Sequence, residues 1–595
     1  MAELHHFYTT RKSEFNETCE ALKKTIQKFG WLRTGVALLF FYVIYLAFSN
    51  TISWYALLPV IVLFVFLVSW HGKIQGRYDL YRNLEKLNRL ELGVLENNYS
   101  EFNDGKAFVN PHHAYSYDLD LFGPGSLFQF LNRCGTAIGE NKLAENLLKA
   151  QPTIGAIKKR QEAVKELSQN VEFRQWFWAQ GHLLHDSSVE NEGLFRWLEE
   201  PDVVLGKTLY KILLILFPTI SLVLIGFTIY DFWSYFPVLL LFGGVQNVVV
   251  SFKSKEATKA ELALFHHKIL FDKYAQLMSK IAEAEFSGKH LLEIQEEAKD
   301  ASVRMKKFSQ LVNAFEARKN GIASLFGNSL YLYDLQCLYR LEKWRSVNKL
   351  MVSGWLDKIA EVDALNSLGT FHFNNPDNSF PEFHDRLTIQ SEALGHPLIA
   401  STSRVNNSFK IGPENIMLIT GANMAGKSTF LRTTGVNLVL ALSGSSVCAK
   451  YFVCPLISLY TSMRATDSLV DHQSYFYAEL SRLKGIMEEV RRDKPMLVLL
   501  DEILRGTNSK DKHEGSIGLL KQFVSHDVLL MLASHDVALG ELEKTFPEAI
   551  RNYCFESEID NNELTFDYTL HKGIAHKANA TFLMQQMGIL PGTSD

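Results

Sequence analysis

The chain has 595 residues, of which 47% are hydrophobic, and a formal net charge of −4 at pH 7. The length predicts about three to five domains. The acidic balance argues against a protein that binds nucleic acid through global basicity, although local basic patches remain open. The six cysteines include no Cys-x-x-Cys pair and no His/Cys cluster, a pattern typical of reduced thiols in the cytosol that gives no zinc site.

Two pairs of apolar stretches predict membrane-spanning helices. The charged start, residues 1–33, has no signal-peptide cleavage site and is expected to form a cytoplasmic helix. The pairs occupy residues 34–72 and 207–252, and each stretch is close to the roughly 17–25 residues that cross a bilayer. Lys and Arg flank both pairs on their outer sides and are absent from the links within them. The positive-inside rule then predicts two hairpins in the inner (cytoplasmic) membrane, with both termini and all large segments cytoplasmic.

The alternative is that these four stretches are buried core helices of a soluble protein. It is stronger for the last stretch, which Gly243, Gly244, Gln246 and Asn247 interrupt. Small and polar residues of this kind can also mark helix packing inside a membrane. Both interpretations stay open at this point.

The segments outside the hairpins have two different characters. Residues 73–206 and 253–375 carry charged and apolar residues in a helical period and predict an all-α region. Pro376, Pro381 and Pro397, together with Asn and Ser clusters, then mark the start of an α/β region. We assign this region to residues 376–595.

A phosphate-binding loop follows a predicted strand at Ile416–Thr420. Residues 421–429 read G-A-N-M-A-G-K-S-T and fit the pattern G-x-x-x-x-G-K-[ST], and an apolar helix is predicted after them. Glycines let backbone N–H groups wrap phosphates, and a helix N-terminus favours negative charge. We expect Lys427 to reach the β and γ phosphates of ATP and Ser428 to ligate Mg²⁺. The ATP-binding residues expected here are Gly421, Asn423, Met424, Ala425, Gly426, Lys427, Ser428 and Thr429.

Two further predicted strands end in polar residues. The strand 495–500 runs into Asp501 and Glu502, and the strand 528–533 is followed by His535 after Ser534. Asp501 is expected to hold Mg²⁺, directly or through water, and Glu502 to orient or deprotonate the attacking water. His535 could sense the γ-phosphate, although alone it would read as a structural histidine. Together these residues predict a Mg²⁺-dependent ATPase with Glu502 and His535 as catalytic residues.

Four motifs of the α/β region resemble those of the MutS family of ABC-type ATPases. The run T-G-A-N-M-A-G-K-S-T at residues 420–429 is similar to the family's T-G-P-N-M-G-G-K-S-T. Residues 501–511 resemble D-E-I-G-R-G-T-S-x-x-D, residues 474–479 resemble S-T-F-x-x-E, and residues 533–535 resemble A-T-H. A weaker likeness to the family's lever domain extends upstream.

The resemblance implies a P-loop ATPase domain of the ABC/MutS type, joined to an all-α lever and the four predicted transmembrane helices. It also implies a homodimer with composite ATP sites, in which Ser474 reaches the nucleotide of the partner subunit. Asp511 joins the ATP-binding residues on the same grounds. No counterpart of the family's mismatch-reading or connector domains is found. The aromatic residue expected to stack on adenine is not obvious: Ser403 falls near its place, and Arg404 or Phe409 could substitute.

Two functions from different classes follow. The first is a membrane-anchored MutS-like ATPase that still contacts mismatched or branched DNA. The second is an ATP-driven conformational switch that acts on a membrane or protein partner without DNA. A transporter is a weaker third, because no charged residue lies inside the spans. Basic residues of the predicted arm could meet DNA phosphates, but a solvated helix surface explains them as well: Arg304, Lys306, Lys307, Arg318 and Lys319.

Overall fold

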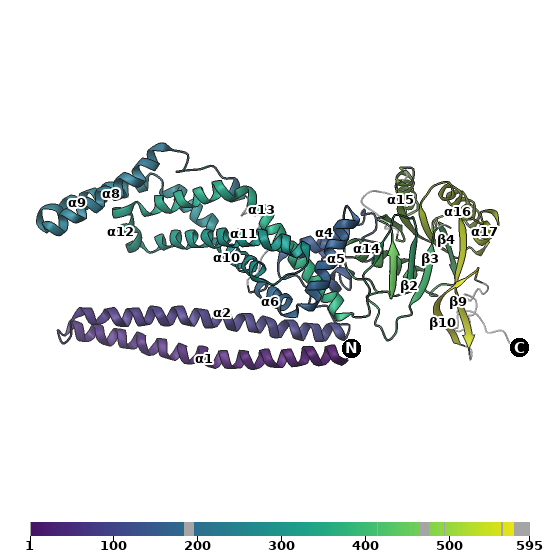
Figure 1. The fold of residues 1–595 in the computed structure, drawn as a ribbon, viewed down its shortest axis with the longest axis horizontal. Coiled ribbons are helices and arrows are strands. Elements are labelled where there is room, and N and C mark those ends of the chain that lie inside the picture. The colour runs from purple at the N-terminus through teal and green to yellow at the C-terminus, as the bar shows by residue number, and fades with distance from the viewer. Residues whose placement is uncertain are drawn as a thin grey trace. The chain divides into compact units, whose positions relative to one another are not determined.

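A computed structural model describes most of the chain (Figure 1). The described ranges are residues 2–183, 196–412, 415–464, 475–492, 494–560 and 563–575. The chain forms two compact units, each built from segments that are distant in sequence. Unit 1 comprises residues 1–92, 134–141 and 172–364. Unit 2 comprises residues 93–133, 142–171 and 365–595.

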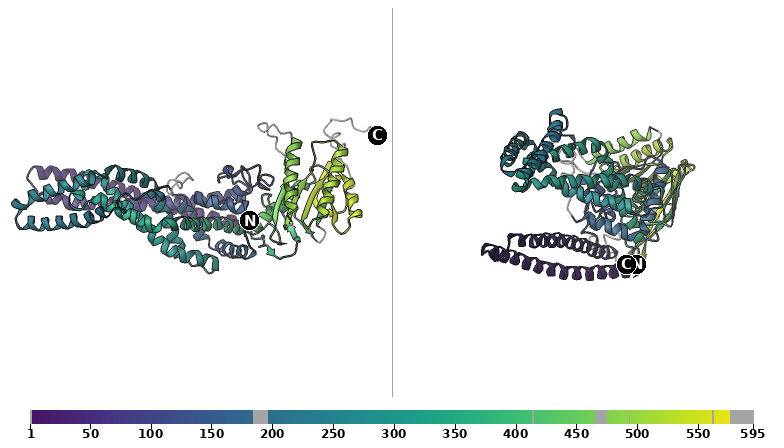
Figure 2. Two further views of the ribbon diagram at one scale, coloured as in Figure 1. Left: turned by 90° about the horizontal axis from the view of Figure 1, so that it is seen from above. Right: turned by 60° about the vertical axis from the view of Figure 1, so that its left-hand side comes forward.

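Two long helices begin the chain. Helices α1 (Ala2–Phe48) and α2 (Leu57–Leu95) are joined by a short turn containing the 3-10 helix η1 (Trp54–Ala56). Figures 1 and 2 show the two helices side by side and antiparallel. The predicted cytoplasmic helix and the first predicted span are therefore one continuous helix.

Polar contacts join this helical hairpin to helix α6 (Val171–Gly181) within unit 1. Arg11 Nε donates a hydrogen bond to Gln175 Oε1 over 3.0 Å, and Gln175 Nε2 donates to Asn88 Oδ1 over 3.0 Å. Asn83 Nδ2 donates to the carbonyl oxygen of Ala179 over 3.0 Å. These contacts hold the N-terminal part of α1 and the C-terminal part of α2 against α6.

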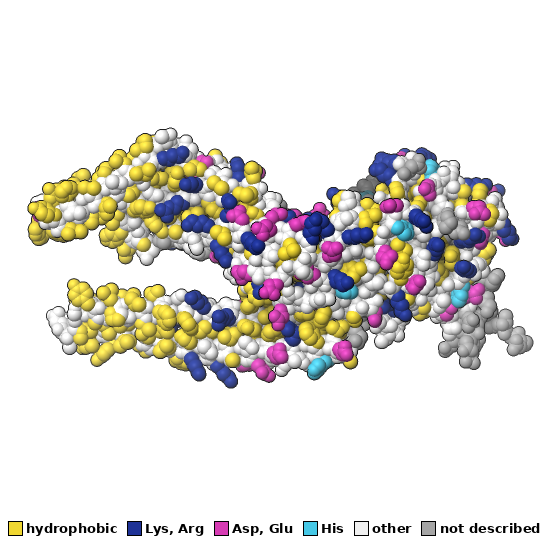
Figure 3. Space-filling view, in the orientation of Figure 1, with side chains coloured by type: hydrophobic (Ala, Val, Ile, Leu, Met, Phe, Trp, Pro, Cys, Tyr) yellow, Lys and Arg dark blue, Asp and Glu magenta, His cyan; other side chains and the backbone are white. Residues whose placement is uncertain are grey.

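A second helical hairpin consists of α8 (Thr208–Tyr230) and α9 (Phe232–Ser251). Asp231 lies in the turn and caps α9, because its carboxylate accepts from the backbone N–H of Ser234. In α1, η1–α2, α8 and α9, an apolar stretch is long enough to cross a membrane by length and composition. Only 11–17% of each stretch is buried in the protein, and Figure 3 shows hydrophobic side chains covering these helices. This exposure does not agree with the alternative of four buried core helices.

Unit 1 continues with helices that pack around an aromatic core. Helices α10 (Ser254–Glu283) and α11 (Lys289–Glu316) pack against each other and agree with the all-α region predicted for residues 253–375. Phe308 of α11 lies with its ring centroid 4.3 Å from Phe271 and 4.4 Å from Trp344. The remaining helices with residues in unit 1 are η3 (Ala317–Lys319), α12 (Gly321–Tyr331), α13 (Tyr333–Asn374) and α4 (Ala137–Leu148).

Unit 2 contains a six-stranded sheet with the order β10-β9-β4-β8-β7-β6. The strands are β4 (Ile416–Gly421), β6 (Ser458–Ser462), β7 (Met496–Asp501), β8 (Leu529–Ser534), β9 (Ile550–Asp560) and β10 (Glu563–Lys572). All neighbouring pairs are parallel except β9 with β10. Every residue of β4, β7 and β8 is buried, as in parallel sheets covered on both faces. The strands predicted at 416–420, 495–500 and 528–533 are thus confirmed.

Helices cover this sheet, and unit 2 also contains a smaller, four-stranded sheet. Helix α14 (Lys427–Leu442) follows β4 directly and packs against β4, β7 and β8. The other helices of unit 2 are η2 (Lys106–Phe108), α3 (Leu127–Leu131), α5 (Ile154–Gln169), α15 (Tyr475–Val490), α16 (Ser509–Val524), η4 (Val537–Glu541) and α17 (Leu542–Thr545). The smaller sheet has the order β1-β5-β2-β3, with β1 (Glu382–Phe383), β2 (Ile389–Leu394), β3 (Asn407–Ile411) and β5 (Tyr451–Cys454).

Candidate functional site

The loop between β4 and α14 has the backbone of a tight turn. Met424 has φ +67° and Gly426 has φ +108°, a value that only glycine adopts without strain. A Cβ on Gly421 would lie 2.6 Å from the carbonyl oxygen of Phe555, so glycine is required there for space as well. Ala425 is buried, whereas the Met424 side chain is 75% exposed. The loop therefore presents Met424 outward at the carboxyl edge of the sheet.

Lys427 is the first residue of α14, and its ammonium group is buried under this loop. Nζ donates to the carbonyl oxygens of Gly421 and Ala422, each over 2.8 Å. Burial lowers the pKa of Lys427 to about 8, although the nearby carboxylates of Glu502 and Asp501 act in the opposite direction. The ammonium group is thus held inside the loop by two carbonyl oxygens, with the carboxylates of Glu502 and Asp501 nearby.

Asp501 ends β7 with its side chain buried. Its Oδ1 has no hydrogen-bond partner within the described residues, and Oδ2 lies 3.6 Å from Nη2 of Arg505. A buried carboxylate oxygen without a partner is costly unless a cation or a donor binds it. The hydroxyl-bearing Ser428 lies exposed in the first turn of α14. This donor set fits Mg²⁺, which binds proteins through one or two oxygen ligands and completes its shell with water and phosphate.

No cluster of three or more His, Cys, Asp or Glu side chains occurs in the part of the chain that the structure describes. An all-protein metal cage is therefore not present among those residues. A Mg²⁺ ion at Asp501 and Ser428 would depend on the nucleotide for further oxygens.

Glu502 and His535 lie in contact at the ends of the adjacent strands β7 and β8. Oε1 of Glu502 forms an ion pair with Nε2 of His535, and Nδ1 of His535 lies 2.9 Å from the carbonyl oxygen of Gly421. The backbone of Glu502 has φ +49°, and its N–H donates to the carbonyl oxygen of Ala533 over 2.9 Å. The hydrogen bond with His535 is the largest cause that holds the pKa of Glu502 at about 2. Glu502 is therefore ionised but, while paired, a weak base.

Glu479 of α15 supports the segment that follows Glu502, a role that the sequence alone did not indicate. Its carboxylate accepts from the backbone N–H groups of Leu504, over 2.5 Å, and Arg505, over 3.2 Å. Leu504 has φ +61°, so this segment turns sharply for a residue with a side chain. Burial raises the pKa of Glu479. The only signal in the sequence was its place in the S-T-F-x-x-E motif.

Ser474 and Asp511 are the two ATP-binding residues predicted outside the loop. Ser474 lies outside the described residues. Asp511 lies exposed in the first turn of α16, where its backbone N–H donates to Asn508 Oδ1 over 2.9 Å and its carboxylate accepts from Asn508 Nδ2 over 2.8 Å. The role of Ser474 at the nucleotide of the partner subunit and that of Asp511 in ATP binding stay predictions.

A cavity of about 190 Å³ lies beside Gly426 and is lined by aromatic and polar residues. Tyr568 lines it from β10, with its ring against Gly426, where an added Cβ would lie 3.2 Å from the ring. Tyr568 has φ +53° and lies in a β-bulge. Asn407 fixes this bulge, because its side chain donates to the carbonyl oxygen of Tyr568 over 3.0 Å and accepts from the N–H of Leu570 over 2.7 Å. No sequence motif singled out Tyr568 as a residue that could stack on adenine.

The residues proposed for adenine stacking have mixed outcomes. Ser403 and Arg404 line the cavity, as does the buried ring of Phe555. Phe409 does not line it. Its ring is 5% exposed and packs against Phe430, with the centroids 5.4 Å apart. Phe409 alternates inward on β3 and belongs to the core beneath the cavity.

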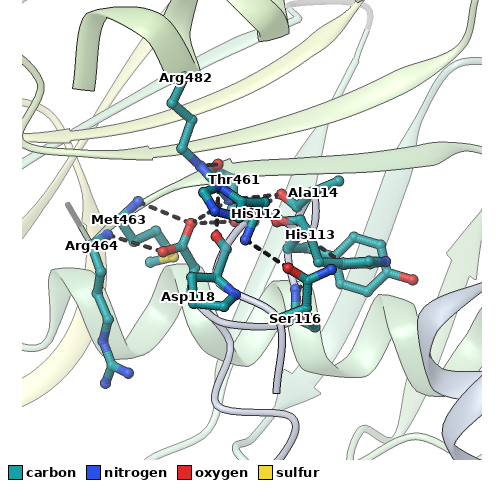
Figure 4. Close-up of polar contacts among 12 residues, drawn as sticks. His112, His113, Ala114, Ser116, Asp118, Thr461, Met463, Arg464 and Arg482 are labelled. Atoms are coloured by element: carbon teal, nitrogen blue, oxygen red, sulfur yellow. Dashed lines mark hydrogen bonds and ion pairs between the residues drawn. The ribbon is translucent and has the colours of Figure 1, made fainter. Parts of the chain in front are cut away.

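The segment before α3 is bound to the sheet by polar contacts of Asp118 (Figure 4). The Asp118 side chain is 1% exposed. Oδ2 of Asp118 accepts from Thr461 Oγ1 over 2.6 Å and from Arg482 Nη2 over 3.1 Å. Oδ1 accepts from the backbone N–H of Arg464 over 3.0 Å. Arg482 Nη2 also donates to the carbonyl oxygen of Ala114 over 3.1 Å. One buried carboxylate therefore joins residues from the end of β6 and from α15.

Asp120 makes a second, more exposed connection to the loop-bearing helix. Its carboxylate pairs with Arg432 of α14 over 3.0 Å and with both terminal nitrogens of Arg464, over 2.5 and 2.7 Å. Arg464 is the last described residue before the segment that contains Ser474. Asp118 and Asp120 thus hold Arg464 and the helix of the phosphate loop to the same short stretch of chain.

The basic residues considered for DNA binding are mostly paired within unit 1. Arg304 pairs with Asp300 over 2.7 Å, and Lys306 donates to Ser279 over 2.8 Å. Arg318 forms a largely buried ion pair with Asp334 over 3.1 Å, and Lys319 lies 3.9 Å from Glu316. These contacts favour a solvated helix surface over a row of phosphate-binding cations.

Comparison with known proteins finds similarity in the C-terminal part of the chain. The model of MutS domain V matches residues 417–591. The DNA mismatch repair protein MutS of Thermotoga maritima is 28% identical over 239 residues, which are 39% of this chain and 29% of that protein. The protein of the same name from Thermotoga neapolitana is 30% identical over 230 residues, 37% of this chain and 28% of that protein. The chain thus matches less than a third of the length of these relatives.

Proposed function

Because the C-terminal part of this chain belongs to the MutS family, we propose that it is an ATPase that binds and hydrolyses ATP at the carboxyl edge of the six-stranded sheet. One observation carries the proposal. Lys427, the Asp501–Glu502 pair and His535 come from three separate segments and converge at the ends of β4, β7 and β8. Ligands of open α/β sheets bind at this edge.

The proposed roles follow from these positions. Lys427 leaves the carbonyl oxygens of Gly421 and Ala422 to contact the β and γ phosphates, and the N-terminus of α14 faces the same negative charge. Asp501 and Ser428 hold Mg²⁺. When bound, Mg²⁺ neutralises charge on the phosphate oxygens during phosphoryl transfer.

Glu502 positions the attacking water, and His535 controls how strongly basic that carboxylate is. While His535 pairs with Glu502, the carboxylate is a weak base with a pKa of about 2. A γ-phosphate that draws His535 toward itself would release Glu502 and raise its basicity, which makes water activation depend on bound nucleotide. The cavity beside Gly426 receives the adenine, with Tyr568 as the stacking ring.

The test of the ATPase uses the full chain purified in detergent or in a lipid nanodisc. ATP turnover is expected with Mg²⁺ and is expected to stop when EDTA removes the metal. Lys427→Ala should abolish nucleotide binding. Turnover that survives in Lys427→Ala would refute the assignment of the site.

We further propose that two copies of the chain form composite sites, with Ser474 of one subunit at the nucleotide of the other. The resemblance to the family supports this arrangement. Mixing Ser474→Ala chains with Lys427→Ala chains tests it: each variant alone should be inactive. A mixed dimer keeps one site with both native residues, so partial turnover should return. No recovery in a mixture shown to form heterodimers would contradict the shared site.

The proposed location is the inner (cytoplasmic) membrane, with two hairpins anchoring large cytoplasmic domains in lipid. The apolar and exposed surfaces of α1, α2, α8 and α9 support it. Lipid would cover side chains that water would otherwise contact at high cost. Membrane fractionation followed by carbonate extraction tests it, and a chain released by carbonate would contradict it.

A test with DNA distinguishes two candidate functions of this ATPase. The relatives are named as DNA mismatch repair proteins, and that name supports an ATPase coupled to mismatched or branched DNA. The internal pairing of Arg304, Lys306 and Arg318 favours instead a conformational switch acting on a membrane or protein partner. Turnover is measured with and without heteroduplex or branched DNA across salt concentrations. Turnover that is flat, with no salt-sensitive DNA binding, would exclude the first candidate.

A further inference from the structure

Helix α12 (Gly321–Tyr331) is an apolar helix that packs against the second hairpin. Its eleven residues contain no Asp, Glu, Lys or Arg. Ser329 of α12 accepts from Asn247 Nδ2 of α9 over 2.7 Å. Gly243 of α9 lies so close that an added Cβ would be 3.1 Å from the Cβ of Ser329. The contact between the two helices is therefore close and polar.

The polar side chains of α12 face the protein. Asn328 is 4% exposed, donates to Ser324 Oγ over 3.1 Å and accepts from the backbone N–H of Asp334 over 2.9 Å. The opposite face carries Ile322, Leu325 and Phe326, which are 72%, 57% and 64% exposed. A helix on the surface of a water-soluble domain has the reverse order, with apolar residues inside and polar residues outside.

The second hairpin has the same inverted arrangement. Gln246 of α9 and Ser221 of α8 are buried and joined by a hydrogen bond of 2.6 Å. Ile215, Leu222 and Leu241 on the outer surface are 72%, 70% and 73% exposed. The outer faces of α8, α9 and α12 are thus apolar in the same way. If lipid covers the hairpin α8–α9, lipid also suits the outer face of α12. Figure 3 shows hydrophobic side chains gathered over this end of unit 1.

The ends of α12 bear the features of a helix that stops at a membrane surface. Arg318 and Asp334, which flank it, form an ion pair with side chains 11% and 4% exposed. Arg340 Nη2 donates to the hydroxyl of Tyr331 over 3.0 Å, and tyrosines are common at membrane–water interfaces. Eleven residues rise about 16 Å, roughly half of a 30 Å hydrocarbon core, so α12 cannot cross a bilayer.

We propose that α12 is a third membrane-inserted element, which lies in the lipid of one leaflet beside the hairpin α8–α9 with Ile322, Leu325 and Phe326 against acyl chains. The proposal rests on the membrane anchoring proposed above. The apex between α11 and α13 then lies in the membrane rather than in the cytoplasm. Movement of α13 would then change contacts between the protein and the acyl chains, in addition to contacts outside the membrane.

The experiment places one nitroxide spin label at a time on the full chain in lipid nanodiscs. The six native cysteines are first replaced, or shown not to react, since all are buried. Labels at residues 322, 325 and 326 report on α12. Leu241 of α9 is the membrane control, and Leu350 of α13, 88% exposed, is the water control. Collision with oxygen, which concentrates in lipid, is compared with collision with a water-soluble nickel chelate. Each labelled chain must keep its ATP turnover, which excludes misfolded variants.

The expected result is a ratio of oxygen to nickel collisions at residues 322, 325 and 326 that matches residue 241 and exceeds residue 350 several-fold. If residue 241 reports lipid and residue 325 reports water, the insertion of α12 is refuted while membrane anchoring stands. If residue 241 also reports water, the anchoring itself fails. A label at residue 325 that neither reagent reaches would mean that protein, such as a second copy of the chain, covers α12, and this too overturns the proposal.

Discussion

Glu502 and His535 form an ion pair that joins the carboxyl ends of two neighbouring parallel strands, β7 and β8. The second ring nitrogen of the histidine, Nδ1, lies 2.9 Å from the carbonyl oxygen of Gly421 on β4. The ring of His535 therefore lies between the Glu502 carboxylate and the carbonyl oxygen of Gly421. One side chain thus connects the proposed catalytic carboxylate to the start of the phosphate loop.

Replacing Glu502 with glutamine should separate binding from hydrolysis. The amide keeps the size of the side chain but cannot orient or deprotonate water as a carboxylate does. We expect ATP affinity to change little and turnover to fall by about 10²–10⁴-fold. Steady-state turnover and equilibrium binding of a fluorescent ATP analogue measure the two effects. Glu514→Gln on α16, where the side chain is 65% exposed, is the matched control and should leave both unchanged. Turnover retained in Glu502→Gln would remove Glu502 from the mechanism.

ATP affinity should fall as the pH rises through about 8. Burial lowers the pKa of Lys427 to about 8 from an ordinary value of 10.5. Below pH 8 the free protein already carries the ammonium group that phosphate requires. Above pH 8 the neutral amine must take up a proton on binding, so affinity should weaken by about tenfold per pH unit. The dissociation constant of a non-hydrolysable ATP analogue is measured from pH 7 to 9.5.

The control for this pH series is Lys450→Met, which removes an exposed lysine of unit 2 and should leave the slope unchanged. A dissociation constant that is flat across the range in the native chain would show that Lys427 stays charged there or does not contact the nucleotide.

The strands and helices around the loop were predictable because each carries a local signal. β4, β7 and β8 are strands of six residues that begin with four or five apolar residues and end in Gly, Asp and Ser. Apolar pairs with basic flanks likewise indicated four long exposed helices. The composition of the two units was not predictable, since residues 93–133 join unit 2 through Asp118, far from Arg482 in sequence. Hydrophobic periodicity carries no information about such distant partners.

The residues of the candidate site also fall into two groups, those that a local sequence motif predicts and those that it does not. Lys427 and Asp501 belong to motifs in which spacing and chemistry agree, and the structure brings them to one edge. Tyr568 could not be selected, because its place depends on a β-bulge and on Asn407, which is 161 residues away. Phe409 seemed equally suitable as an aromatic residue, but alternation along β3 turns it into the core. The direction of a side chain in a short strand depends on register, which the sequence alone did not fix.

Tyr568 should contribute to ATP affinity through its ring and not through its hydroxyl. Stacking of a base on an aromatic side chain contributes about 1–3 kcal/mol, so Tyr568→Ala should weaken ATP binding by about tenfold. Tyr568→Phe keeps the ring and should bind as the native chain does. Competition binding of ATP and of inorganic triphosphate to each variant provides the measurement. Equal losses for both ligands would show that the effect does not come from the base.

Asp118 and Asp120 offer a matched pair for testing how the upstream segment is held. Asp118 is 1% exposed, and it accepts from Thr461, Arg482 and the backbone of residues 463 and 464. Asp118→Asn replaces one acceptor oxygen with a donor that faces these donors, and it leaves Arg482 without a counter-charge. Since Arg482 is itself 22% exposed, we expect a loss of about 3 kcal/mol, the low end for breaking a buried pair.

Asp120→Asn is the control two residues away. The Asp120 side chain is 43% exposed, and an ion pair in contact with water contributes less than about 1 kcal/mol. Chemical denaturation followed by tryptophan fluorescence compares the two variants, and salt should reduce the small effect of Asp120→Asn further. Arg432 of α14 and Arg464 both pair with Asp120. We therefore expect loss of the Asp120 charge to lower mainly ATP turnover, with ATP affinity retained. Equal destabilisation by the two substitutions would show that burial of the Asp118 carboxylate is not what holds the segment to the sheet.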